Sequence, residues 1–221
     1  MVDIFDEVDE ELRAERAQRL LKRYAGVIVA AALLIVGAAA GWQAWRWYQA
    51  KQDQAAAAEY LTAMNLAEAP AGVSDAARNG ASIAVLNKLE TTAPAGYRTL
   101  ARLRGAAAKA ASGDLPGALA LWDQVAADTS ADPLLRDLAS LMWVEHQIDS
   151  GDPALLQARL APLAAPGNAW HALADEQLAL LDMRLGKSDA AKVTLRRLAQ
   201  DTTAPNGVRG RASTLLSRLG G

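Results

Sequence analysis

The sequence predicts an all-α protein in which a single membrane-spanning helix precedes a solenoid of antiparallel helical hairpins. Alanine and leucine dominate the chain of 221 residues, which has one phenylalanine and few runs of β-branched residues. This composition favours helix over strand nearly throughout. A long uncharged stretch near the N-terminus predicts the membrane helix, and a pattern that follows three glycines predicts the hairpins.

The uncharged stretch extends from Tyr24 to Trp45, and Gln43 is its only strongly polar side chain. As a helix rising about 1.5 Å per residue it would be about 33 Å long, enough for the roughly 30 Å hydrocarbon core of a bilayer. A buried helix of a soluble protein would need a polar stripe over this length, and the sequence shows none. We therefore predict a transmembrane helix at residues 24–45.

Two alternatives to a retained anchor remain open from the sequence. The stretch could be a cleaved secretory signal, with the small residues Ala38, Ala39 and Ala40 at the cleavage site. Against cleavage, the segment before it is long and rich in acidic residues, and apolar residues continue beyond Ala40. The tryptophans that follow could instead pack on a soluble core. We expect the helix to be retained.

Charged and aromatic residues beside the stretch predict its orientation. Basic residues are concentrated before it, whereas only Arg46 and Lys51 lie shortly after it. An excess of Lys and Arg marks the cytoplasmic side, so the N-terminus is expected in the cytoplasm and the C-terminal part outside. Aromatic side chains that prefer the membrane interface mark both ends, namely Tyr24 at the inner end and Trp42, Trp45, Trp47 and Tyr48 at the outer end.

Four segments follow from these assignments. They are a charged cytoplasmic tail at residues 1–23, the transmembrane helix at 24–45, a helical extension at 46–71 and a helical domain at 72–221. The tail is expected to be helical from about Asp9, because two acid–base pairs have the stabilising i,i+4 spacing, namely Asp9/Arg13 and Glu15/Arg19. Neither glycine nor proline interrupts the extension before Pro70, so the membrane helix is expected to continue through it.

Glycine, proline and aspartate divide the rest of the chain into helical segments with short connections. Short connections between helices indicate antiparallel neighbours. The predicted helices are Ser74–Thr91, Gly96–Ser112, Leu115–Asp128, Pro133–Ser150, Pro153–Leu163, Asn168–Leu185, Ser188–Gln200 and Pro205–Leu219.

Three glycines introduce the same pattern of small and apolar residues. Gly113, Gly151 and Gly186 are each followed by such residues at offsets of five, nine and twelve. The glycine relaxes the backbone between two helices, and the three later positions form one face of the second helix. These positions are Ala118, Trp122 and Val125; Leu156, Leu160 and Leu163; and Ala191, Leu195 and Leu198.

The glycines are 38 and 35 residues apart, close to the period of about 34 residues of helix–turn–helix repeats. Gly72 introduces a fainter fourth copy, with Ala77, Ala81 and Ala84. The pattern resembles tetratricopeptide repeats (TPRs), although the aromatic residues usual in their first helices are mostly missing. The sequence thus predicts a TPR-like α-solenoid, with an irregular helical bundle as the alternative.

The last predicted helix suits the end of such a solenoid, where a cap must cover apolar surface. Its apolar residues share one side and its arginines lie on others. The apolar residues are Val208, Ala212, Leu215 and Leu219, and the arginines are Arg209, Arg211 and Arg218.

No catalytic, metal-binding or cofactor-binding motif is recognisable in the sequence. Cysteine is absent, which excludes disulfides and thiolate metal sites, and a net charge of −2 gives no sign of a nucleic-acid-binding face. Two histidines have a carboxylate nearby, Glu145 beside His146 and Asp175 one turn after His171. We predict a protein without enzymatic activity, cofactor or small-molecule substrate.

Gly37 and Gly41 form a GxxxG pattern within the membrane helix, and Gly26, Ala30 and Ala38 add further small residues. Small faces let membrane helices approach closely. We predict that Gly37 and Gly41 pack against a second membrane helix. The alternative is that alanine and glycine are simply abundant in this stretch.

Three stretches together resemble the YfgM-like family, the ancillary subunits of the bacterial SecYEG translocon. They are AAGWQAWRWYQ after the anchor, GYRTLARLRGAAAKAASGD in the middle and DEQLALLDMRLGKSDAAKVTLRRLAQDTTAP near the end. The resemblance implies a single-pass protein of the bacterial inner membrane whose periplasmic TPR-like domain binds other proteins near the translocon. The implied partners are translocon subunits, a periplasmic chaperone of the peptidyl-prolyl isomerase type and emerging unfolded chains. It assigns no individual binding residue.

Three functions fit these features. The first is a non-enzymatic scaffold at the periplasmic side of the translocon that links it to periplasmic chaperones. The second is an adaptor that coordinates envelope synthesis or cell division through a similar domain. The third, an enzyme built on Glu145/His146 or His171/Asp175, would need a pocket that converges on a histidine. We favour the first.

Overall fold

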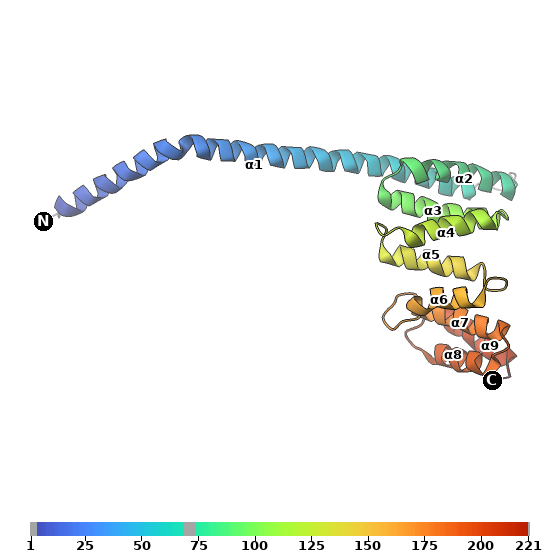
Figure 1. Cartoon of the computed structure of the whole chain (residues 1–221). Coiled ribbons are helices and arrows are strands. Elements are labelled where there is room, and N and C mark those ends of the chain that lie inside the picture. The colour runs from blue at the N-terminus through green and yellow to red at the C-terminus, as the bar shows by residue number, and fades with distance from the viewer. Residues whose placement is uncertain (1–3, 69–73, 221) are drawn as a thin grey trace. The chain divides into compact units, whose positions relative to one another are not determined.

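A computed structural model describes residues 4–68 and 74–220, without the side chains of residues 4–21, 75 and 76. The described residues form nine helices and no strand, which confirms the predicted all-α class (Figure 1). The tail pairs Asp9/Arg13 and Glu15/Arg19, and Gly72, lie outside what is described. The helices are α1 (Ile4–Ala67), α2 (Asp75–Thr92), α3 (Ala95–Ala111), α4 (Leu115–Ala127), α5 (Pro133–Glu145), α6 (Pro153–Leu163), α7 (His171–Arg184), α8 (Ser188–Gln200) and α9 (Asn206–Arg218).

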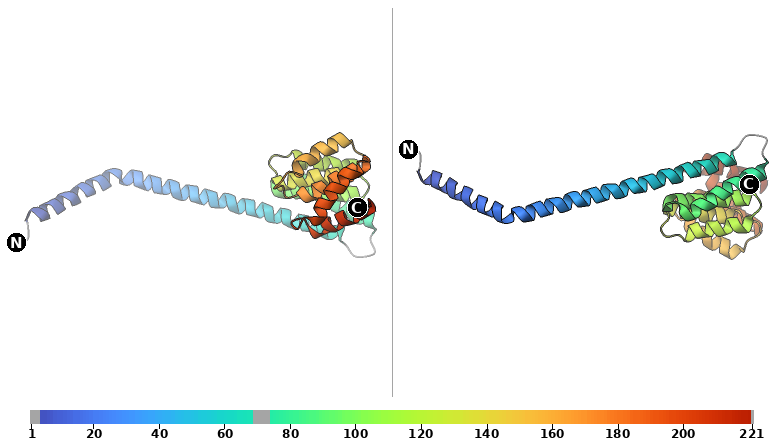
Figure 2. Two further views of the ribbon diagram at one scale, coloured as in Figure 1. Left: turned by 90° about the horizontal axis from the view of Figure 1, so that it is seen from below. Right: turned by 90° about the horizontal axis from the view of Figure 1, so that it is seen from above.

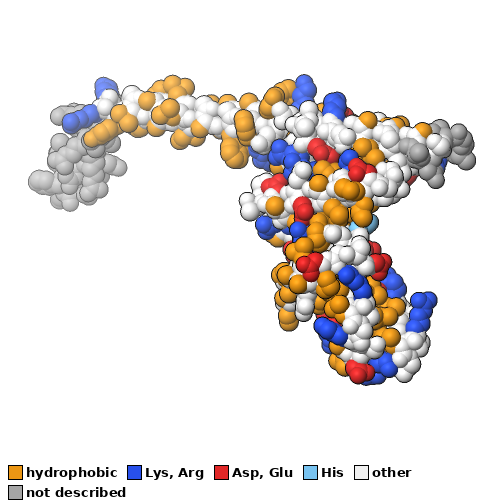
Figure 3. Space-filling model, turned by 45° about the vertical axis from the view of Figure 1, so that its right-hand side comes forward, with side chains coloured by type: hydrophobic (Ala, Val, Ile, Leu, Met, Phe, Trp, Pro, Cys, Tyr) orange, Lys and Arg blue, Asp and Glu red, His pale blue; other side chains and the backbone are white. Residues whose placement is uncertain are grey.

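The first of two compact units comprises residues 1–52. Helix α1 begins at Ile4, before the predicted start near Asp9, and continues unbroken through the predicted membrane stretch. One part of it is long and apolar enough to cross a membrane, with a mean hydropathy of 2.2. Its side chains from Lys22 to Gln52 are exposed, and Figure 3 shows apolar side chains along its surface. Among the described side chains of this unit, the segment therefore has no apolar partner to pack against.

The second unit, residues 53–221, is a series of helical hairpins. Each helix from α2 to α9 packs against the next, and α7 also contacts α5 and α9. Figure 2 shows the helices of this unit from two further sides. Connections of a few residues force consecutive helices to run antiparallel, as the sequence predicted. The predicted arrangement of stacked hairpins is confirmed.

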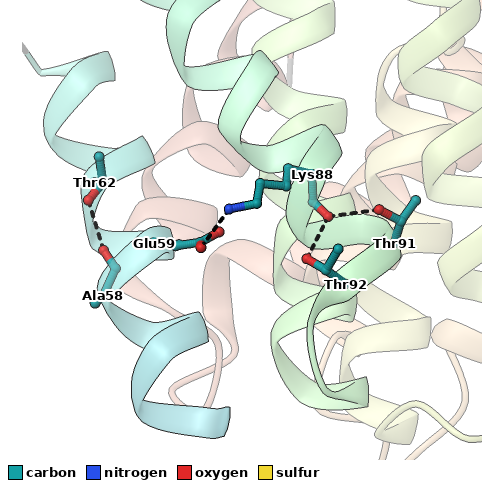
Figure 4. A network of polar contacts seen from close by, with 6 residues as sticks. All are labelled: Ala58, Glu59, Thr62, Lys88, Thr91 and Thr92. Carbon is teal, nitrogen blue, oxygen red and sulfur yellow. Dashed lines mark hydrogen bonds and ion pairs between the residues drawn. The ribbon is translucent and has the colours of Figure 1, made fainter.

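The end of α1 belongs to this second unit and pairs with α2. Ala56 and Ala63 are buried with Leu86 and Leu89. At the surface, Lys88 Nζ donates a hydrogen bond of 2.7 Å to Glu59 Oε1 (Figure 4). Residues 53–67 share this buried cluster with α2 and α3 and so extend the solenoid by one helix.

The core forms a continuous strip because neighbouring clusters share a helix. One cluster lies between α1, α2 and α3, a second extends from α3 to α7, and a third joins α7, α8 and α9. Helix α3 contributes Ala101 to the first and Ala106 to the second, and α7 contributes Ala174 to the second and Ala179 to the third. Each hairpin thus buries its apolar face mainly against its neighbours, as in other helical solenoids.

All nine predicted repeat positions are buried, with at most 2% of each residue exposed. The stripes on α4, α6 and α8 are therefore confirmed. The fourth copy is wrong, because Ala77, Ala81 and Ala84 are exposed on α2. The buried stripe of α2 has the same spacing five residues later, at Ser82, Leu86 and Leu89.

The three repeat glycines meet different requirements. Gly113 and Gly186 have φ angles of 88° and 73°, in the left-handed region that favours glycine. At each of these two glycines the helix ends in a Schellman motif, in which the glycine N–H and the N–H of the next residue donate to carbonyl oxygens of the last helical turn. Asp114 N, for example, donates to Lys109 O at 2.9 Å. Gly151 instead allows a close approach, because an added Cβ would lie 2.9 Å from the carbonyl oxygen of Gln147.

Aspartate and proline begin several of the helices. The Asp132 and Asp152 side chains accept hydrogen bonds from the first turns of α5 and α6, each of which starts with proline. Asp114 similarly accepts from Gly117 N at 3.0 Å, and this bond lowers the pKa of the Asp114 carboxyl. These local patterns explain why most predicted helix starts are accurate.

Helix α5 ends at Glu145, five residues before the predicted end at Ser150. The guanidinium of Arg184, from the end of α7, donates hydrogen bonds of 2.7 Å to the carbonyl oxygens of Ile148 and Gly151. These carbonyls are held in a non-helical turn by a residue from the next hairpin. Sequence patterns within α5 alone could not have predicted this end.

Candidate binding groove

The second unit has a groove of about 980 Å³ along helices α5, α7 and α9. These are the first helices of two hairpins and the terminal helix, and they share one side of the stack. Most of the lining is apolar, with a few polar side chains near the α7–α9 wall. The lining residues are Leu138, Leu141, Met142, Glu145 and Ile148; Trp170, Leu173, Glu176, Gln177 and Leu180; and Gly207, Gly210, Arg211, Thr214, Leu215 and Arg218.

The lining side chains lie in rows because the three helices repeat at an interval of 35 residues. Leu141, Glu176 and Arg211 occupy equivalent positions, and Glu145, Leu180 and Leu215 form another such row. Each helix presents the i, i+3, i+4, i+7 positions that form one face. The groove is therefore a direct consequence of the repeat.

An ion pair joins two members of the first row. Arg211 Nε and Nη2 donate to Glu176 Oε1 and Oε2, each at 2.6 Å. The Glu176 side chain is 4% exposed, whereas that of Arg211 is 56% exposed. A fork-shaped guanidinium can bind both oxygens of a carboxylate at once. Its hydrogen bonds to Glu176 raise the pKa of Arg211, so the guanidinium stays charged.

Gln177, next to Glu176, has an unused acceptor. The residue is 8% exposed, and its side-chain oxygen Oε1 is buried without a hydrogen-bond partner in the described chain. A buried carbonyl of this kind costs free energy unless a donor reaches it. Gln177 lines the groove, but this oxygen has less than 1 Å² of accessible surface, so a molecule in the groove does not reach it in the observed rotamer.

The two histidines lie outside the groove. The His146 ring lies 4.5 Å from the Trp122 ring, centroid to centroid, and its Nδ1 lies 2.9 Å from Met142 O. His171 and Asp175 do not pair: His171 Nε2 lies 4.0 Å from Asp201, and Asp175 binds Arg197 at 3.0 Å. Neither of the carboxylate–histidine arrangements that the enzyme hypothesis used is therefore part of this groove, although Glu145 lines it.

The predicted membrane-helix residues are exposed in the first unit. Tyr24, Trp42, Trp45, Trp47 and Tyr48 are all at least half exposed. An added Cβ at Gly37 or Gly41 would meet nothing within 4 Å. Their roles at a membrane interface and in helix packing stay predictions, because residues 4–68 and 74–220 contain one candidate membrane helix and no second one for it to pack against.

A comparison with protein families agrees with the repeat geometry. Residues 18–193 match the profile of the tetratricopeptide repeat-like domain. The chain belongs to this family. Searches of curated proteins and of solved structures gave no match. TPR-like domains are generally non-catalytic scaffolds for protein–protein interaction, which supports the predicted class of function in its general form.

Sequence reasoning missed the residues that give the TPR-like groove its polarity. It placed Arg211 on α9 but gave it no partner, and it assigned no role to Glu176 or Gln177. Extending the interval of 35 residues to the first helices of the hairpins would have aligned Glu176 with Arg211. The glycine pattern predicted only the buried positions of α4, α6 and α8, which are the second helices of the hairpins and do not line the groove.

Proposed function

We propose that this protein is a membrane-anchored, non-enzymatic scaffold that binds protein complexes at the periplasmic side of the Sec translocon and links them to periplasmic chaperones. The groove along α5, α7 and α9 carries the proposal, because three equivalent helices present one apolar surface there. Extended concave surfaces of this kind suit the binding of other proteins. The resemblance to the YfgM-like family supports the translocon as the location.

The membrane helix gives the scaffold its place in the cell. An exposed apolar helix near the N-terminus, flanked on that side by more basic residues, favours a single-pass inner-membrane protein with a cytoplasmic N-terminus. The interface aromatics Tyr24, Trp42, Trp45, Trp47 and Tyr48 would then lie at the two headgroup layers. A reporter fused after Gly221 should be active only when exported. If a second reporter that is active only in the cytoplasm were active when fused after Gly221, that result would contradict this orientation.

Photo-crosslinking from the groove tests the choice of partner. A photoreactive amino acid at Leu138, Leu180 or Thr214 of the full chain in membranes should crosslink translocon subunits or a periplasmic chaperone. Val193, 65% exposed on α8 and outside the groove, is the matched control position. Crosslinks only to enzymes of cell-wall synthesis would favour the envelope or cell-division adaptor instead. No protein crosslink from any groove position would contradict a scaffold role for this surface.

A further inference from the structure

We propose that Asn206, at the start of α9, is a site of spontaneous deamidation that converts the protein with time into two forms with different terminal helices. The reaction needs only water, so it goes beyond the proposed scaffold function and does not depend on any partner. Three observations carry it, namely an Asn-Gly sequence, an unbonded N–H at Gly207 and the guanidinium of Arg209. A second Asn-Gly pair, Asn79–Gly80 in α2, has the sequence without the other two features.

The Asn-Gly sequence allows the chain to react with itself. The backbone nitrogen of Gly207, after giving its proton to hydroxide, attacks Cγ of the Asn206 side chain, and the side-chain nitrogen leaves as ammonia. The product is a five-membered succinimide ring that contains atoms of both residues. Glycine hinders this attack least, because it has no Cβ and adopts the required backbone angles readily.

The attacking nitrogen of Gly207 is not held in a hydrogen bond. Gly207 is the second residue of α9, and the first N–H groups of a helix have no acceptor within it. The N-cap, Pro205, supplies no side-chain acceptor, and no described backbone carbonyl accepts from Gly207 N. Asn206 and Gly207 are also exposed. Hydroxide therefore reaches this nitrogen, and the first turn opens at little cost in free energy.

Arg209 supplies a charged donor at the reacting carbonyl. Its Nη2 donates a hydrogen bond to Oδ1 of Asn206. Attack on Cγ places negative charge on this oxygen, and a charged donor beside a developing oxyanion stabilises the transition state. The leaving nitrogen of Asn206 has no hydrogen-bond partner among the described residues, so nothing in that part of the chain opposes its departure.

The pair Asn79–Gly80 shows what the interior of a helix changes. Gly80 is the sixth residue of α2, so its N–H donates to the carbonyl oxygen four residues earlier. The nitrogen can attack only after this part of α2 opens, which costs more free energy than opening a first turn. Asn79 is also only partly exposed. The same dipeptide should therefore react more slowly in α2 than in α9.

Water opens the succinimide in one of two ways. Breaking the bond between Cγ and the Gly207 nitrogen leaves an aspartate, whose charge at the start of α9 and three residues before Arg209 is favourable. Breaking the main-chain bond leaves an isoaspartate, in which the chain continues through Cβ of residue 206. Ala204 and Val208, on either side, are 4% and 2% exposed and belong to the core cluster of α7, α8 and α9. The isoaspartate form therefore loosens the terminal helix, whereas the aspartate form retains it.

Ageing of the full chain in phosphatidylcholine nanodiscs tests the site. After incubation at physiological temperature and neutral or mildly alkaline pH, mass spectrometry measures the deamidated fraction of the peptides that contain Asn206 and Asn79. Deamidation of Asn206 should be about tenfold faster than that of Asn79, because the first turn of α9 opens more easily than the interior of α2. Its rate should rise with pH, since hydroxide removes the proton from Gly207. Equal rates at the two asparagines, or a faster rate at Asn79, would overturn the proposal.

Three variants separate the contributions to the rate. Gly207→Ala should slow deamidation of Asn206 about tenfold, because a Cβ hinders the attack. This Cβ would meet only Arg211 Nη1, at 3.5 Å, so α9 should remain folded. Gly80→Ala is the matched control and should leave the rate at Asn206 unchanged. Arg209→Ala should slow the reaction about threefold through loss of the charged donor. An unchanged rate in both Gly207→Ala and Arg209→Ala would exclude ring formation and overturn the proposal.

Hydrogen exchange of the aged protein tests the effect on α9. The isoaspartate and aspartate peptides separate by chromatography, and electron-transfer fragmentation tells them apart. Residues 204–212 should exchange faster in the isoaspartate form than in the unreacted chain. Asn206→Asp, which reproduces the aspartate form, should retain the exchange rate of the unreacted chain. Equal exchange in the isoaspartate form and the unreacted chain would overturn the loosening of the terminal helix.

Discussion

Arg211 of α9 holds both carboxylate oxygens of Glu176 of α7, at 2.6 Å each, across an interval of 35 residues. The carboxylate is almost fully buried, while the guanidinium is half in solvent. The pair therefore ties the terminal helix to the last complete hairpin. It also places an ion pair at the wall of a groove whose lining is mostly apolar.

Arg211→Ala should destabilise the second unit by about 2 to 3 kcal/mol, because it leaves the buried carboxylate of Glu176 without its donors. Arg211→Lys should cost less, since an ammonium restores the charge but not both hydrogen bonds. In a double-mutant cycle, adding Glu176→Gln should reduce the penalty of Arg211→Ala. Chemical denaturation of the full chain in nanodiscs measures these changes.

Arg209→Ala is the control for that cycle. Arg209 lies on the same helix, but within the described part of the chain its guanidinium hydrogen-bonds only to the exposed side chain of Asn206. The expected loss is below about 0.5 kcal/mol. If Arg209→Ala lowered the free energy of unfolding as much as Arg211→Ala, the cause would be a general weakening of α9 and not the loss of the pair with Glu176.

Glu90→Gln should stabilise the protein at neutral pH, because burial between α2 and α3 raises the pKa of the Glu90 carboxyl despite the nearby Arg102 and Lys109. The native state therefore favours the protonated acid. Its contribution to stability is present below the usual glutamate pKa of about 4.3 and is lost as pH rises through the raised pKa. The thermal midpoints of Glu90→Gln and of the unmodified protein, measured from acidic to neutral pH, should differ most at neutral pH.

Glu59→Gln provides the contrast. Glu59 pairs with Lys88 at the surface, 2.7 Å away, and both side chains are more than a third exposed. Removing this pair should slightly lower the thermal midpoint at neutral pH, since exposed pairs contribute little. A gain in stability from Glu59→Gln equal to that from Glu90→Gln would rule out burial as the cause.

The sequence predicts those parts of the fold that depend on local patterns. Aspartate and proline mark the starts of α5 and α6, and glycine offsets locate the buried stripes, because the responsible residues lie within one hairpin. The early end of α5 depends on Arg184, from the following hairpin. The groove polarity depends on Glu176 and Arg211, which meet only after the terminal helix α9 packs against the hairpin of α7 and α8. Such contacts cannot be predicted until it is known how the hairpins stack on one another.

Gly186→Ala should destabilise the second unit by about 1 to 2 kcal/mol, because its φ angle of 73° strains any residue with a Cβ. Gly186→Asn should cost less, since asparagine tolerates the left-handed region better. Gly80→Ala should have the opposite sign and stabilise by about 0.5 to 1 kcal/mol, because Gly80 lies inside α2 with open space beside it. Thermal denaturation of the three variants checks the order.

Gly37→Leu combined with Gly41→Leu should weaken association with a membrane partner, if the bare face of α1 packs against a second helix. Neither glycine has a neighbour within 4 Å of an added Cβ, so leucine fits within the single chain and should not destabilise it. Leucine would, however, hold two membrane helices apart. The measurement is the amount of partner that co-purifies from membranes in mild detergent.

Ala39→Leu, on the opposite side of the helix, is the control, because residues two apart lie about 200° around the helix axis. Equal co-purification from the Gly37/Gly41 variant and the Ala39 variant would show that this face makes no essential helix contact. The anchor would then serve only to hold the groove at the membrane.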